Sequence, residues 1–140
     1  MQRRQFIKSS CSFCLLSSAG FAIVELSSCA NLPVYKTSII ESKVSIPVSL
    51  FVSSNLQIIR VKNLEYDIAL RKENNDSYSA LLMQCTHADN SLNSTGNGFN
   101  CNLHGSRFDQ QGHVLKGPAA QSLKKYSTQI ISDQIIISLK

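Results

Sequence analysis

Histidine is scarce in this chain, since His87, His104 and His113 are the only three in 140 residues. Tryptophan is absent, and charged residues make up only 16% of the sequence. Chemistry that needs more than three imidazoles is therefore excluded. The low charge, combined with 43% hydrophobic residues, excludes a disordered tail and supplies enough apolar material for a core. The length favours a single domain.

The N-terminus also lacks an apolar run long enough to span a bilayer, which takes about 20 residues. Residues 9–24 are uncharged but rich in serine, and they follow Arg3, Arg4 and Lys8. A charged start followed by a modestly apolar segment is typical of an export signal. Residues 3–8 resemble the twin-arginine signal, an address read by a receptor rather than an anchor. The alternative is an accidental pair of arginines.

A cysteine closes this segment in the sequence Leu26-Ser27-Ser28-Cys29, which resembles the bacterial lipobox. We therefore expect residues 1–28 to be a signal peptide and Cys29 to receive lipid, although Glu25 departs from the usual pattern. Buried acyl chains contribute about 0.8 kcal/mol per methylene, so they would hold the domain at the membrane surface. The expected location is the extracytoplasmic face of the membrane. The alternatives are an ordinary cleavage site and an uncleaved N-terminal helix that acts as a short anchor.

The rest of the chain divides into an expected tether over 29–42 and one domain over 43–140. Apolar residues recur with a period of two, which predicts short strands, and no window has a convincing helical period. The sequence therefore predicts an antiparallel β-sandwich or barrel, with Pro47 confining its strand to an edge or a bulge. The net charge beyond residue 28 is only +3, which argues against nucleic acid as a partner. The expected strands are 44–50, 56–61, 66–70, 78–83, 128–131 and 135–139.

Two short motifs combine the remaining cysteines and histidines. They are Cys85-Thr86-His87 and Cys101-Asn102-Leu103-His104. Two thiolates and two imidazoles on two loops predict a metal centre. A disulfide suits an exported protein but leaves the histidines unexplained. A zinc site has the right ligand count, but zinc fingers usually pair cysteine with cysteine and histidine with histidine. A [2Fe–2S] centre with two cysteines on one iron and two histidines on the other also fits.

The chain resembles the Rieske iron–sulfur family over about residues 36–140, most clearly over 85–119. The two Cys-His motifs carry the resemblance, supported by Ser106 and by Gly117-Pro118-Ala119. The resemblance implies an all-β, Rieske-type sandwich with a small subdomain that binds one [2Fe–2S] cluster through the loops of 85–119. The resemblance also implies a role for each of these residues. Cys85 and Cys101 would hold the buried iron, and His87 and His104 would hold the outer, reducible iron. The loop Gly117, Pro118 and Ala119 would cover the cluster.

The sequence departs from the family at positions that affect the reduction potential. Asn90 and Leu103 stand where Rieske subunits of cytochrome bc-type complexes carry two disulfide-bonded cysteines. Ser106 is kept as a donor to the cluster, but Phe108 replaces a tyrosine whose hydroxyl donates to a ligand sulfur. Because such donors stabilise the reduced cluster, we expect a potential in the lower or middle part of the range of about −150 to +300 mV. His113 is expected to be a surface residue.

These residues predict one-electron transfer rather than a self-sufficient enzyme. A Rieske oxygenase needs a second iron held by two histidines and a carboxylate, and only His113 is left for it. We expect one of two roles. The chain is either the Rieske subunit of a membrane complex that oxidises quinol, or a ferredoxin-like carrier or small subunit that serves another envelope oxidoreductase. A b- or c-type cytochrome is the expected redox partner. The alternative function is a zinc-stabilised β-domain with a binding role.

Overall fold

The computed structural model describes residues 32–74 and 77–140, which belong to one compact unit over Leu32–Lys140. The expected signal peptide with Arg3 and Arg4, and the expected lipid site Cys29, lie outside the described residues. No helix within the described residues is long and apolar enough to cross a membrane.

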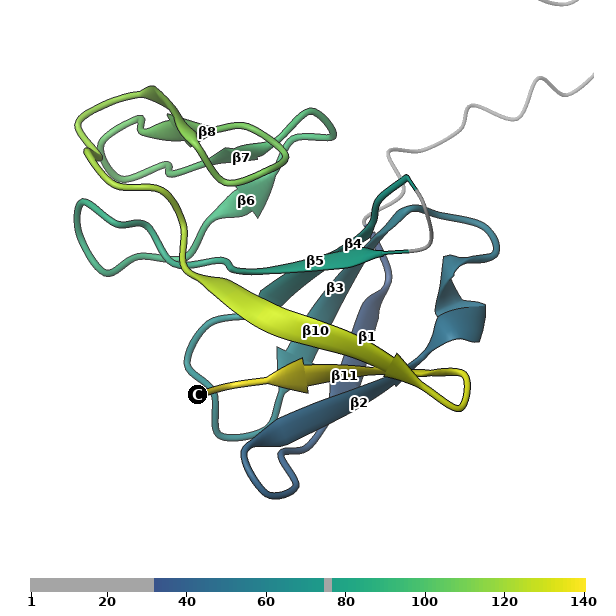
Figure 1. The fold of residues 1–140 in the computed structure, drawn as a ribbon. Helices are drawn as coiled ribbons and strands as arrows, with labels where there is room; N and C mark the ends of the chain where they lie inside the picture. Colours follow the sequence, from purple (N-terminus) through teal and green to yellow (C-terminus); the bar gives the residue numbers. More distant parts are fainter. Residues whose placement is uncertain (1–31, 75–76) are drawn as a thin grey trace, which may run out of the picture. The chain divides into compact units, whose positions relative to one another are not determined.

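The larger of two sheets has seven strands in the order β1-β3-β4-β5-β10-β11-β2 (Figure 1). All neighbours are antiparallel except β1 and β3, which are parallel. As expected, Pro47 lies on an edge strand, because β2 is the last strand of the order. The strands are β1 (Val34–Thr37), β2 (Lys43–Pro47), β3 (Leu56–Val61), β4 (Ile68–Lys72), β5 (Tyr78–Leu82), β10 (Lys125–Ile131) and β11 (Gln134–Ser138).

Two local expectations need correction. Residues 34–37, which the sequence assigned to a tether, form β1, because main-chain pairing with β3 places Val34 opposite Ile58 and Thr37 opposite Val61. Residues 48–50, expected to continue the strand that contains Pro47, belong instead to the short 3-10 helix η1 (Val48–Phe51). The side chain of Phe51 is buried in the core, so the turn of the helix buries an aromatic ring that a continued edge strand would not place there.

The larger sheet has a hydrophobic core on each face where β3, β4 and β5 lie. In β5, Ala80 and Leu82 point into the first core, whereas Leu81 points into the second. Successive side chains of a strand point to opposite faces, so a strand buried on both faces is apolar without alternation. The first core also receives Ile135 and Ile137 of β11 and residues of β2, so the sheet curls around it.

The smaller sheet contains four short strands and packs Phe99, Phe108 and Val114 into the second core, while Leu115 is exposed. Figure 1 shows it beyond the end of β5 and the start of β10. Leu81 and Leu123 lie directly over Gly112, so the two sheets meet closely there. The expectation of an all-β fold with a small separate sheet is confirmed. The strands, in sheet order, are β6 (Asn93–Ser94), β7 (Phe99–Asn100), β8 (Arg107–Phe108) and β9 (Val114–Lys116).

Candidate metal centre

The two predicted cysteine ligands lie in the second core. Cys85 follows β5, and Cys101 begins the turn that joins β7 to β8. Each residue is only 1% exposed, and both thiols are free. The structure therefore does not contain the disulfide that was one interpretation of their spacing.

The turn between β7 and β8 is a tight hairpin that exposes its tip. The N–H of Cys101 donates to the carbonyl of Ser106 at 2.9 Å, and the N–H of Gly105 donates to the carbonyl of Cys101 at 3.0 Å. Gly105 has φ +79°, in the left-handed region that glycine adopts at little cost. This geometry buries Cys101 while it leaves Leu103 and His104 at the surface.

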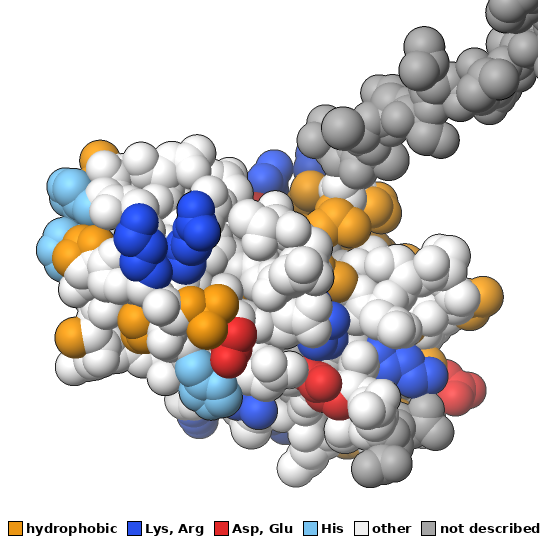
Figure 2. Space-filling view, turned by 90° about the horizontal axis from the view of Figure 1, so that it is seen from above, with side chains coloured by type: hydrophobic (Ala, Val, Ile, Leu, Met, Phe, Trp, Pro, Cys, Tyr) orange, Lys and Arg blue, Asp and Glu red, His pale blue; other side chains and the backbone are white. Residues whose placement is uncertain are grey.

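The two predicted histidine ligands, His87 and His104, come from different loops and meet at the surface. Their ring centroids are 4.9 Å apart, and the ring planes are nearly perpendicular at 84°. Figure 2 shows two histidine side chains side by side at one end of the molecule. The structure thus places a pair of thiols in the core and a pair of imidazoles at the surface.

Three hydrogen bonds join the loops of this site. The side-chain amide of Asn90 lies 3.6 Å from the Cys101 sulfur and connects the first loop to the second. The N–H of Ala119 donates to the Ser106 hydroxyl at 3.0 Å, connecting the second loop to the segment Gly117–Ala119. The Thr86 hydroxyl donates to the carbonyl of Gln121 at 2.6 Å. Sequence analysis missed Asn90 and Thr86 as structural contacts, because the partners are distant in sequence.

The environment of the Cys101 sulfur favours the thiolate. Burial raises the pKa of Cys101, but hydrogen bonds outweigh burial and leave this pKa below its ordinary value. The donors are the Asn90 amide, the backbone N–H groups of Leu103 and His104, and the Cys85 thiol. A thiolate is the form that binds iron or zinc.

The two expected tuning residues, Ser106 and Phe108, are fully buried beside the second loop. The Ser106 hydroxyl accepts from Ala119, which leaves its own O–H proton free to donate. Phe108 belongs to the second core and faces Phe99 across the β7–β8 pair. In the expected covering loop, the peptide between Gly117 and Pro118 is cis, and Ala119 is buried while its two neighbours are exposed.

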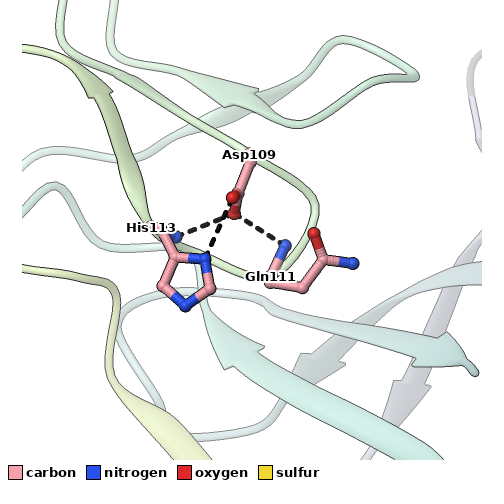
Figure 3. Close-up of polar contacts among 3 residues, drawn as sticks. All are labelled: Asp109, Gln111 and His113. Carbon is pink, nitrogen blue, oxygen red and sulfur yellow. Dashed lines mark hydrogen bonds and ion pairs between the residues drawn. The ribbon is translucent and has the colours of Figure 1, made fainter.

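The third histidine belongs to a separate polar cluster in the turn between β8 and β9. One oxygen of the Asp109 carboxylate accepts from the N–H groups of Gln111 and His113, and the other lies 3.0 Å from the His113 ring (Figure 3). Burial raises the pKa of Asp109, but these bonds outweigh burial and lower the pKa. The His113 side chain is 68% exposed, so it is a surface residue, as expected.

The donor set fits a two-iron cluster better than a single ion. Within residues 32–74 and 77–140, no three Cys, His, Asp or Glu side chains are grouped so as to hold one metal. A structural zinc site needs four ligands around one ion. A Rieske centre instead takes two cysteines at one iron and two histidines at the other, which matches one buried pair and one exposed pair.

Comparisons with known proteins identify one family. The Rieske [2Fe-2S] domain model matches residues 48–127. Cytochrome b6-f complex iron-sulfur subunit 2 of Nostoc sp. (strain PCC 7120 / SAG 25.82 / UTEX 2576) is 34% identical over 73 residues, which is 51% of this chain and 41% of the relative. Subunit 1 of Synechocystis sp. (strain ATCC 27184 / PCC 6803 / Kazusa) is 41% identical over 56 residues, 39% of this chain and 32% of the relative. The chain thus matches less than half the length of these relatives.

A solved structure extends the similarity over most of the fold. The cyanobacterial plasma membrane Rieske protein PetC3 from Synechocystis PCC 6803 superposes with a TM-score of 0.57 at 26% identity. The alignment covers 68% of this chain and 98% of that protein. The family model matches more than half of the chain and includes both Cys-His motifs. The chain therefore belongs to the Rieske [2Fe-2S] domain family.

Proposed function

We propose that this protein transfers single electrons through one Rieske-type [2Fe–2S] cluster. The observation that carries the proposal is the division of four side chains into a buried pair of thiols and an exposed pair of imidazoles, inside a domain of the Rieske family. When bound, the cluster would accept and release one electron. The chain supplies the four ligands. It surrounds the cysteine side of the site with a dry core and leaves the histidine side at the protein surface.

Each side chain has a distinct role in this proposal. Cys85 and Cys101 hold the cluster end that lies in the core, where burial keeps water away from the sulfurs. His87 and His104 hold the other end at the surface, so a partner can approach to within contact of the imidazoles. Because imidazole is neutral and thiolate is negative, this ligand set lowers the negative charge and favours reduction.

The partner we propose is a subunit of a membrane redox complex or another envelope oxidoreductase. The relatives named above are iron-sulfur subunits of cytochrome b6-f complexes, and the similar solved structure is a plasma membrane Rieske protein. A b- or c-type cytochrome is the expected acceptor, and quinol is the donor if this chain is the Rieske subunit of such a complex. Asn90 and Leu103, which exclude the disulfide of bc-type subunits, favour the ferredoxin-like carrier instead.

An experiment on the purified protein tests the function. Residues 30–140 purified without oxygen should be red-brown, with about two irons and two sulfides per chain. After reduction they should give the low average g-value of mixed histidine and cysteine ligation in the EPR spectrum. A colourless protein that holds one zinc and no sulfide, after expression with ample iron, would overturn the proposal and support the zinc-stabilised binding domain.

We also propose that the protein is exported with its cluster and tethered by lipid. The twin-arginine route carries folded proteins, which suits a cofactor assembled before export. Replacement of both Arg3 and Arg4 by lysine should leave the precursor inside the cell, whereas unchanged export would contradict this part of the proposal. Separately, Cys29→Ala should abolish labelling by a lipid precursor, and a variant that is still labelled would contradict the lipid site.

A further inference from the structure

Asn90 contacts both cysteines of the site. Its backbone carbonyl accepts the N–H of Cys85 at 2.8 Å. Its side-chain nitrogen Nδ2 lies 3.6 Å from the sulfur of Cys101 and 3.4 Å from the carbonyl oxygen of Ser91. Both neighbours of this nitrogen are acceptors, so the amide must point its N–H₂ group, and not its oxygen, toward the sulfur.

We propose that Asn90 is a positioning residue for the cluster: its side chain fixes the second ligand loop against the first, and its amide donates to the Cys101 sulfur and thereby raises the reduction potential. This inference rests on the proposed function, because it concerns the sulfur only as an iron ligand.

The donor effect follows from the charge that reduction adds. The reduced cluster is more negative, so a hydrogen bond to a ligand sulfur stabilises it more than the oxidised cluster. Cys101 is 1% exposed, and a hydrogen bond is stronger electrostatically in such a low-dielectric setting than in water. A metal-bound thiol is deprotonated, so the Cys85 thiol cannot donate once it is a ligand. The Asn90 amide then remains beside the backbone N–H groups of Leu103 and His104.

The side chain and the backbone of Asn90 can be tested separately. The hydrogen bond from Cys85 goes to the Asn90 carbonyl, which belongs to the backbone and is retained in every substitution. Asn90→Ala therefore removes the contact with Cys101 but keeps the turn of the first loop. Asn90→Gln keeps an amide donor on a longer side chain. Asn102→Ala is the matched control, since Asn102 is an exposed neighbour of Cys101 whose side chain accepts from Asn100.

The first measurement is the reduction potential, by protein-film voltammetry, of the wild type and of the variants Asn90→Ala, Asn90→Gln and Asn102→Ala. We expect Asn90→Ala to lower the equilibrium constant for one-electron reduction about tenfold, as for loss of a hydrogen bond to a charged group. For one electron this is a shift of about 59 mV. Asn90→Gln should lie between Asn90→Ala and the wild type, and Asn102→Ala should match the wild type. We also expect a chelator to bleach Asn90→Ala several-fold faster than Asn102→Ala.

A second measurement uses the unaltered sequence and does not depend on any variant folding. Protein that carries ¹⁵N only in the asparagine side-chain amide should show a weak ¹⁵N coupling in the pulsed EPR spectrum of the reduced cluster. No coupling, or an Asn90→Ala variant that carries the cluster with the wild-type potential, overturns the inference. A wild-type protein without two irons and two sulfides refutes the proposed function instead, so the two failures are distinguishable.

Discussion

Phe108 sets the polarity of the core next to the second ligand loop. It is 1% exposed and has no hydroxyl, and Phe108→Tyr would place one in a dry environment. A buried tyrosine hydroxyl needs a partner, and a ligand sulfur is the expected acceptor. A donor worth about 1–2 kcal/mol to the reduced cluster corresponds to about 40–90 mV for one electron. We expect Phe108→Tyr to raise the potential by this amount and Ser106→Ala to lower it by a similar amount.

Protein-film voltammetry measures both shifts. Phe99→Tyr is the control, because Phe99 lies opposite Phe108 in the same core and the substitution is identical. A negative shift in Phe108→Tyr, or an equal shift in Phe99→Tyr, would mean that packing around the loops decides the potential, not the number of donors.

Asp109 stabilises the β8–β9 turn only while it is ionised. Its pKa is lowered in the folded protein, because hydrogen bonds to its carboxylate outweigh burial. A lowered carboxyl pKa contributes stability that is complete above the unfolded pKa of about 3.9 and is lost as the pH falls through the folded value. We expect Asp109→Asn to lower the free energy of unfolding at neutral pH, and the difference from the wild type to shrink as the pH falls below about 3.9.

Urea unfolding followed by circular dichroism across this pH range measures the difference. Glu41→Gln, which alters an exposed carboxylate in the turn between β1 and β2, should show no such dependence. If Asp109→Asn lowers the free energy of unfolding by the same amount at pH 2 and at pH 7, the shape of the Asp109 side chain and not its charge stabilises the turn.

At the scale of elements, the small sheet depends on a close backbone approach at Gly98. A Cβ built on Gly98 would overlap the carbonyl oxygen of Phe108, and φ is +150°. Gly96, in the same turn, also has positive φ at +79°, but a Cβ there meets nothing within 4 Å. Gly96→Ala should therefore cost about 1 kcal/mol from backbone strain alone, whereas Gly98→Ala should cost more and separate β7 from β8.

Thermal unfolding of the two variants, followed both by circular dichroism and by loss of the cluster absorbance, tests this expectation. The cluster of Gly98→Ala should be lost at a clearly lower temperature than that of Gly96→Ala. Equal melting temperatures would mean that the turn can move away from β8 at little cost.

At the scale of the whole molecule, two exposed cations lie on the small sheet near the histidines, while the carboxylate of Asp89, beside His87, accepts a hydrogen bond from Gln84. Arg107 lies at the foot of the hairpin that carries His104, its strand partner is Lys116, and both are exposed. Figure 2 shows two basic side chains side by side near the paired histidines. Asp109, on the same subdomain, is paired with His113. Since charges act over about 8 Å at physiological ionic strength, an oxidant at the histidines should sense the two cations.

We therefore expect ferricyanide to oxidise the reduced protein faster than the cationic tris(phenanthroline)cobalt(III), after correction for driving force, with an advantage that falls as salt rises. Arg107→Glu with Lys116→Glu should lower the ratio of the two rate constants severalfold. The same reversal at Lys36 in β1 and Lys62 directly after β3, both exposed, should change the ratio little. Equal effects of the two double variants would mean that only net charge matters.

The sequence alone was sufficient for features that depend on local pattern. Short segments rich in apolar residues, bounded by polar turns, predicted β2, β3, β4, β5, β10 and β11. The Cys-His motifs predicted a metal centre formed by two loops, and their resemblance to a known family predicted the family. Both predictions were possible because the type and the spacing of the ligands are local properties of the sequence. The loss of a hydroxyl at Phe108 could also be read from the sequence through the resemblance, whereas its burial could not.

Only the tertiary structure decided the features that depend on contacts between distant segments. β1 could not be foreseen within residues 34–37, because its parallel partner β3 lies more than twenty residues away. The contact of Asn90 with Cys101, the bond from Ala119 to Ser106 and the pairing of the histidine rings likewise join separate loops. A local pattern specifies which chemistry a residue can perform, but the fold determines which residues meet, because loop closure and packing are properties of the whole chain.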